Sequence, residues 1–135
     1  FKDICMPFNI EKDDLRNYLI QTLLNLQIHL VLPENASFFR LIMEQTQRSK
    51  QLAQHIHEQG PKHIQNAIAC ILTKANELGL ITCEEPEYSA QLFFGIVRNL
   101  EWQVLMNIYV QENEHENLKY IHYCVDRFLD GHQKA

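Results

Sequence analysis

Apolar residues recur every three or four positions along most of the chain, a spacing that predicts α-helices. The first of these segments, residues 10–31, carries two apolar stripes, and a helix that is apolar on two sides is surrounded by protein. Asn9 precedes this segment and can serve as its N-cap, with acidic residues in the first turn favouring the positive end of the helix dipole. We therefore expect a largely buried first helix.

Glycine and proline mark where further helices begin and end. Proline is favoured in the first turn of a helix and glycine directly after the last turn. Pro61 and Pro86 therefore indicate beginnings, and Gly60, Gly79 and Gly131 indicate ends. The segments between these marks predict helices at residues 35–45, 49–59, 61–78, 86–109 and 115–130. Because β-branched and polar residues never alternate over a useful length, we expect no strands. The prediction is a single all-α domain spanning residues 1–135, a bundle of five to six helices.

The last two predicted helices are each apolar on two sides. One side can face the domain's own core, but the other must meet a second surface, because large exposed apolar patches are uncommon on monomers. Small Gly95 beside bulky Phe94 and Trp102 suits a close helix crossing. We predict a homodimer in which these two helices from each subunit form a four-helix bundle. The alternative is that both sides are buried inside one larger bundle. The predicted interface residues are Phe94, Gly95, Arg98, Trp102, Leu105, Tyr109, Ile121, Cys124 and Phe128.

Charge argues against direct contact with nucleic acid. The chain has 12 Lys and Arg against 17 Asp and Glu, a net charge of −5, and no basic block. Proteins that hold DNA neutralise several phosphates with basic side chains, so these residues are poor candidates for a DNA-contacting surface. No apolar run is long enough for a membrane helix, and the first residues do not resemble a signal peptide. We expect a cytoplasmic protein that has no contact with a membrane.

Motifs for catalysis or metal binding are missing from the sequence. The four Cys are scattered without a C-x-x-C pair, which favours reduced thiols in a core over a zinc site. Glu112 and His115 have the Glu-x-x-His spacing of metal-binding bundles, but no second such motif accompanies them. His55 and His57 point to opposite sides of a helix. No phosphate-binding loop or nucleophile motif occurs. We therefore expect no enzyme, no metal and no cofactor, although a catalytic site built from distant residues stays open.

Large, soft side chains on inward faces leave room for a different kind of site. Phe39, Met43, Phe93 and Trp102 have few charged neighbours. A helical bundle can open an apolar cavity between its helices, with a few polar groups that orient a ligand. The alternative is that these side chains simply fill the core, and periodicity alone favours that interpretation.

Several short segments follow one another in a recognisable order. They are residues 38–44 (FFRLIME), 51–53 (QLA), 58–61 (EQGP), 75–81 (ANELGLI) and 85–95 (EPEYSAQLFFG). In this order and spacing the chain resembles the effector domain of TetR-family transcriptional regulators, in the branch that includes repressors of multidrug efflux pumps. The resemblance extends from about residue 15 to residue 128.

This resemblance implies a homodimer built through the last two long helices and a small, often apolar effector bound among the helices. Effector binding would change the separation of two N-terminal helix-turn-helix heads and so release an operator. Because no helix-turn-helix lies in this sequence, we expect a truncated regulator, a repressor, that keeps sensing and dimerisation without DNA binding. The residues expected to contact the effector are Leu23, Phe39, Met43, Ile68, Phe93 and Val97.

Two other functions are open at this point. One is a helical module without a ligand, whose apolar faces bind a partner protein and whose core is solid. The other is a metal-dependent helical enzyme, which metal analysis of the purified protein would test.

Overall fold

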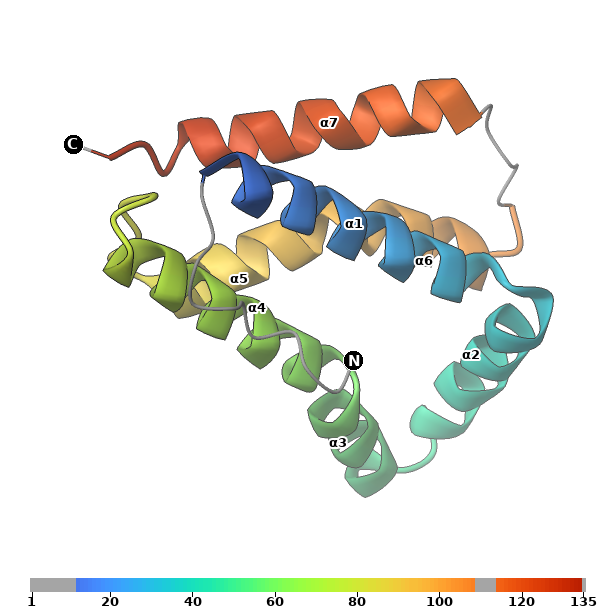
Figure 1. Cartoon of the computed structure of the whole chain (residues 1–135). Coiled ribbons are helices and arrows are strands. Elements are labelled where there is room, and N and C mark those ends of the chain that lie inside the picture. Colours follow the sequence, from blue (N-terminus) through green and yellow to red (C-terminus); the bar gives the residue numbers. More distant parts are fainter. Residues whose placement is uncertain (1–11, 109–113, 135) are drawn as a thin grey trace.

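The computed structural model describes residues 12–108 and 114–134, and all regular secondary structure in these ranges is helical. The elements in chain order are α1 (Lys12–Val31), α2 (Pro33–Thr46), α3 (Lys50–Gln59), α4 (Pro61–Glu77), α5 (Pro86–Phe94), the 3₁₀ turn η1 (Gly95–Val97), α6 (Arg98–Leu105) and α7 (Glu114–Asp130). Since α5, η1 and α6 follow without a break, they form one bent helical segment. The predicted all-α bundle of five to six helices is therefore confirmed (Figure 1).

Helix boundaries follow the punctuation of the sequence in most places. Pro33, Pro61 and Pro86 each occupy the first turn of a helix. The Ser49 hydroxyl accepts a hydrogen bond of 3.1 Å from the backbone N–H of Leu52 and so caps α3. The expected helix at residues 86–109 is the exception, because η1 interrupts it and α6 ends at residue 105. The N-cap predicted at Asn9 lies outside the described residues.

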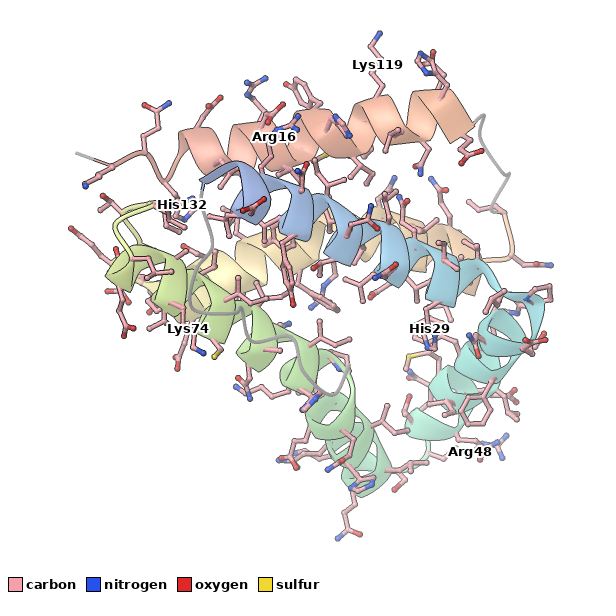
Figure 2. The ribbon with its side chains drawn as sticks, in the orientation of Figure 1. Arg16, His29, Arg48, Lys74, Lys119 and His132 are labelled. Carbon is pink, nitrogen blue, oxygen red and sulfur yellow. The ribbon has the colours of Figure 1, made fainter. Side chains whose placement is uncertain are left out.

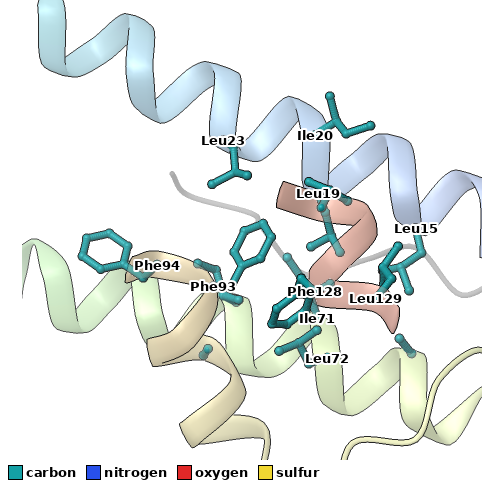
Figure 3. Packing of buried hydrophobic residues seen from close by; sticks show 14 of the residues in the cluster. Leu15, Leu19, Ile20, Leu23, Ile71, Leu72, Phe93, Phe94, Phe128 and Leu129 are labelled. Atoms are coloured by element: carbon teal, nitrogen blue, oxygen red, sulfur yellow. The ribbon is translucent and has the colours of Figure 1, made fainter. Parts of the chain in front are cut away.

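The core lies between α1, α4, α5 and α7 (Figure 3). The inner stripe of α1 and the facing sides of the other three helices contribute fully buried side chains. They include Leu15, Leu19, Leu23, Ile68, Ile71, Leu72, Phe93, Ile121 and Val125. The rings of Phe93 and Phe128 meet edge to face with their centroids 5.0 Å apart, which joins α5 to α7 at the centre of this core.

Polar contacts tie α1 to α7 near both ends of the helix pair. Arg16 Nε donates to Asp126 Oδ1 at 2.7 Å and Nη2 donates to Oδ2 at 3.2 Å, so the pair is bidentate. Figure 2 shows Arg16 reaching from α1 towards α7. Further along, the Gln27 and Asn117 amides exchange hydrogen bonds of 3.2 and 2.8 Å. Because Arg16 lies early in α1 and Asp126 late in α7, the two helices run antiparallel.

Helices α2 and α3 stand apart from this core. Within the described chain, Ala36 is the one buried residue of α2, and α3 has none. In Figure 1 these two helices complete a triangle whose other sides are α1 and α4. Arg40 of α2 also reaches the carbonyl of Val104 at the end of α6, with Nη1 donating over 3.0 Å. The α2–α3 arm is therefore held mainly at its ends.

The cysteines differ from the sequence prediction in one case. Cys70 is disulfide-bonded, so the expectation of reduced thiols is wrong for this residue. Cys83 and Cys124 carry free thiols. Cys5 lies outside the described residues. A disulfide is unusual in a cytosolic protein.

Candidate functional site

The side of α5 and α6 opposite the core is apolar and exposed. Tyr88, Leu92, Trp102 and Met106 have exposed fractions of 70%, 65%, 60% and 53%. Together with Gly95 they recur in steps of three, four or seven residues, so they fall along one side of the segment. We call these five residues the outer face of α5–α6. It lies opposite the buried side chains that α5 and α6 contribute to the core.

Gly95 is the smallest residue on this face. Its backbone is helical, with φ −59°, so a larger residue fits the local conformation. A Cβ added there would meet no atom within 4 Å in the described part of the chain. The close helix crossing expected at Gly95 is therefore not made inside one protomer. The space beside this glycine is open to a second molecule.

The last helix also has an aromatic outer side. Tyr120 and Tyr123 are 53% and 58% exposed, and the Arg127 guanidinium lies over the Tyr123 ring at 5.1 Å from its centroid. These three residues form what we call the outer face of α7. Arg127 also pairs with Asp130 one turn later, at 2.8 Å. This helix therefore packs one side on the core and leaves a second side with large aromatic area in solvent.

Contacts near the start of α5 place it beside the end of α7. The Ser89 hydroxyl and His132 Nε2 are 2.7 Å apart, and the backbone N–H of Thr82 donates to the His132 carbonyl at 2.9 Å. The His132 ring is buried, and its Nδ1 lies 2.8 Å from the Phe128 carbonyl oxygen. Together with the contact between Phe93 and Phe128, these contacts show that α5 and the end of α7 are neighbours that run in opposite directions, as helices of a four-helix bundle do.

The structure places the predicted interface residues in two groups. Gly95, Arg98 and Trp102 are exposed, and Leu105 and Cys124 are half-buried. Three others, Phe94, Ile121 and Phe128, are buried in the chain's own core, with exposed fractions of 3%, 0% and 6%. Tyr109 lies outside the described residues. The three buried side chains are corrected to core residues of the protomer, so they are not part of the surface proposed below.

The physical reason that Phe94 is buried is the width of the inner face of α5, the side of this helix that packs on the core. On α5 the buried residues are spaced i, i+3, i+4 and i+7, the pattern of a helix that packs on a globular core. Phe93 and its neighbour Phe94 both fall within that arc. The exposed stripe is therefore rotated away from Phe94 towards Leu92, and sequence reasoning missed Tyr88, Leu92 and Met106. Leu92 lies three residues before Gly95, Tyr88 lies four before Leu92, and Met106 lies four after Trp102, and this helical spacing was the signal that could have found them.

The residues expected to contact an effector do not gather at one place. Leu23, Ile68, Phe93 and Val97 lie in the closed core and are at most 2% exposed. Phe39 and Met43 lie on α2, are half-buried, and are not part of that core cluster. A cavity beside α2 is lined by other residues.

A cavity of about 230 Å³ opens where α1 ends, α2 begins and α6 ends. None of the six predicted effector contacts lines it. Its walls are formed by Val31, Pro33, Ala36, Ser37, Arg40, Val104 and Asn107. Arg40 donates to the Val104 carbonyl and, at 3.4 Å, to the Ser37 hydroxyl. Asn107 takes a left-handed backbone conformation with φ 59° directly after α6. The cavity thus has both apolar and polar walls, with one positive charge that the hydrogen bonds of Arg40 hold in place.

Electrostatic effects at the last helices are local. Burial raises the pKa of the Glu101 carboxyl on α6, and the Arg98 guanidinium one turn earlier acts in the opposite direction. Arg98 also lies over the Phe94 ring at 5.2 Å from its centroid.

Residues 12–108 and 114–134 contain no cluster of three His, Cys, Asp or Glu side chains that could hold a metal ion. Over the same ranges, no helix combines the length and the hydrophobicity needed to cross a bilayer.

An all-helical domain whose last two helical segments are apolar on two sides has the architecture expected of the regulator domains that the sequence resembles. Residues 17–133 match the model of the TetR C-terminal family described as AefR-like transcriptional repressor, C-terminal domain. Since this match covers most of the 135 residues, the chain belongs to that family. No curated protein and no solved structure matches the chain.

Proposed function

We propose that residues 1–135 act as the ligand-sensing and dimerisation domain of a bacterial TetR-like repressor. The domain forms a homodimer in the cytoplasm and binds a small apolar effector. Effector binding shifts the dimer between two arrangements and thereby controls how a helix-turn-helix outside this sequence holds its operator. We propose no enzymatic activity and no cofactor for it.

The observation that carries this proposal is the apolar outer side of both final helical segments. Trp102 on α6 and Tyr123 on α7 are each more than half exposed, and both helices also carry buried side chains. Aromatic residues are enriched in the cores of subunit interfaces. A two-fold axis beside Gly95 would bring two copies of these faces together and cover them.

The effector part of the proposal is supported by the loose packing of α2 and α3. A ligand can be accommodated where a helix has few buried contacts, because displacing that helix costs little. Phe39 and Met43 are half-buried on α2 and available for such contacts. Phe39 and Met43 are therefore the better candidates for effector contacts, whereas Phe93 and its core neighbours stabilise the fold.

Sedimentation equilibrium of Trp102→Ala tests the dimer. Truncating a large aromatic residue at the centre of an interface costs about 2 kcal/mol or more, so we expect a dimer dissociation constant raised roughly thirtyfold. Phe38→Ala is the matched control, because Phe38 is 62% exposed on α2, away from both outer faces. The wild type and Phe38→Ala should remain equally dimeric. Trp102→Ala sedimenting as the wild type would remove Trp102 from the interface.

A monomeric wild type with a solid core would instead favour the ligand-free interaction module. Native mass spectrometry of the purified chain separates these functions further, because a sensor retains or acquires small apolar molecules and an interaction module does not.

A further inference from the structure

The cavity at the corner of α1, α2 and α6 contains a positive charge that has no acidic partner among the described residues. Its lining residues include Arg40 and no Asp or Glu. The ion pairs between described residues are Arg16 with Asp126 and Arg127 with Asp130, and neither involves Arg40. Burial costs the guanidinium part of its hydration, and its hydrogen bonds within the described chain go to neutral acceptors and not to a counter-charge.

Arg40 also has N–H donors that form no hydrogen bond within the described chain. A guanidinium has five N–H donors in a planar fork. Arg40 spends one Nη1 donor on the Val104 carbonyl at 3.0 Å and one Nη2 donor on the Ser37 hydroxyl at a long 3.4 Å. Its remaining donors have no acceptor among the described residues. The contact with Val104 caps the end of α6 and fixes the guanidinium at the cavity wall.

The rest of the lining defines what would fit beside this charge. Val31, Pro33, Ala36 and Val104 are apolar, and the Asn107 side chain offers an amide. The volume of about 230 Å³ lies below the usual range of drug-sized sites, about 300–1,000 Å³. A planar carboxylate suits the guanidinium fork, because it can accept two parallel hydrogen bonds.

We propose that this cavity is a binding site for a small monocarboxylate with a short apolar chain. The carboxylate accepts hydrogen bonds from Arg40, and the chain lies against Val31, Pro33 and Ala36. The site goes beyond the proposed sensing role, because it contains none of the six residues expected to contact an apolar effector. Dimerisation does not enter its test, so either proposal can fail without the other.

The test is an NMR chemical-shift titration of the full 135-residue chain with sodium butyrate. We expect saturable shifts that centre on the backbone amides of Ala36, Ser37 and Asn107. Butyramide has nearly the same shape without the charge, and we expect it to bind at least about tenfold more weakly, the loss typical of a charge-assisted hydrogen bond. Absence of saturable shifts with butyrate, or equal binding of butyramide, overturns the proposal.

Variants assign the binding to this cavity. Arg40→Gln keeps an amide donor for the Val104 carbonyl but removes the charge, and we expect affinity for butyrate to fall at least about tenfold. Arg48→Gln is the matched control, because Arg48 is exposed just beyond the far end of α2 and does not line the cavity (Figure 2). Equal losses in both variants would show a non-specific effect of charge and overturn the proposal.

A second variant keeps the proposal testable if Arg40→Gln fails to fold. Ala36→Leu leaves the charge and both hydrogen bonds of Arg40 in place and fills the cavity with a larger side chain. We expect it to abolish the butyrate shifts while the helical circular dichroism stays that of the wild type. A folded Ala36→Leu variant that binds butyrate as the wild type does places the ligand elsewhere and contradicts the assignment.

Discussion

At the scale of single residues, the bidentate pair of Arg16 and Asp126 connects α1 to the last helix. The hydrogen bond from Arg16 is the largest influence that lowers the pKa of Asp126, with burial acting in the opposite direction. Both side chains are about one third exposed, at 33% and 39%, so solvent weakens the attraction. We expect Asp126→Asn to lower the free energy of unfolding at neutral pH by about 0.5–1 kcal/mol, near the top of the range for exposed ion pairs. Urea denaturation measures this loss.

The pH dependence of that loss has a definite sign. Because the pKa of Asp126 is lower in the folded chain than in the unfolded chain, its contribution is complete above the unfolded value of about 3.9. The contribution disappears as the pH falls through the folded value. The stability difference between wild type and Asp126→Asn should therefore shrink below about pH 4. Asp130→Asn, which breaks a pair within one helix, should cost only a few tenths of a kcal/mol. A pH-independent difference would exclude the ion pair as the cause.

Local signals predicted many individual residues correctly. Pro61 and Pro86 act within one turn of their own positions, so the helix beginnings predicted there could be read without the rest of the fold. Phe94 could not be assigned in this way. Whether a phenylalanine at the edge of a helical face is buried depends on how wide a surface the neighbouring helices offer, and that is a property of the packed structure.

At the scale of elements, the α2–α3 arm should be the least stable part of the described chain. Helix α3 has no buried side chain among its ten described residues, whereas α4 buries Ile68, Ile71, Leu72 and Ala75. Regions with few buried contacts open at low free energy. We expect the amides of α3 to exchange with deuterium about a hundredfold faster than those in the second half of α4, which corresponds to roughly 2.7 kcal/mol.

Hydrogen–deuterium exchange followed by mass spectrometry measures this contrast. Helix α7 is the internal control, because it has the same 17 residues in length as α4 and also packs on the core. A bound effector should add protection in α2 and α3 more than in α7. Protection of α3 equal to that of α4 in the free protein would contradict a loosely held arm.

The predicted helix at residues 86–109 shows what sequence periodicity could and could not provide. Its apolar repeat continues through residues 95–97, so the repeat alone does not show the tighter 3₁₀ turn there. Its end was readable in principle, because Asn107 can adopt the left-handed conformation that terminates helices. The apolar repeat beyond Leu105 masked that signal.

At the scale of the whole molecule, sequence patterning predicted that the last two helices have a second apolar side. The corner cavity could not be predicted, because it joins the junction of α1 and α2 to the end of α6, and these two places are far apart in sequence. In the sequence, Arg40 has the position of an ordinary surface residue on an amphipathic helix. Only the structure shows that it lies beside Val104. Such a site exists only after the helices have packed.

The most direct test of the proposed dimer uses Gly95, where the protomer itself leaves space. A Cβ added at this position meets no atom within 4 Å in the described protomer and the backbone there is helical, so Gly95→Leu should fold normally. In a dimer that packs the outer face of α5–α6 against its copy, the same leucine overlaps the partner. Gln54→Leu, which adds the same side chain on exposed α3, is the control.

Sedimentation equilibrium should show dimeric wild type, dimeric Gln54→Leu and a Gly95→Leu variant with a dissociation constant raised at least about tenfold, the effect of overpacking by 1–3 kcal/mol. Circular dichroism should be unchanged for all three. A Gly95→Leu variant that dimerises as tightly as the wild type, or a wild type that is monomeric throughout, would contradict a homodimer formed through these helices.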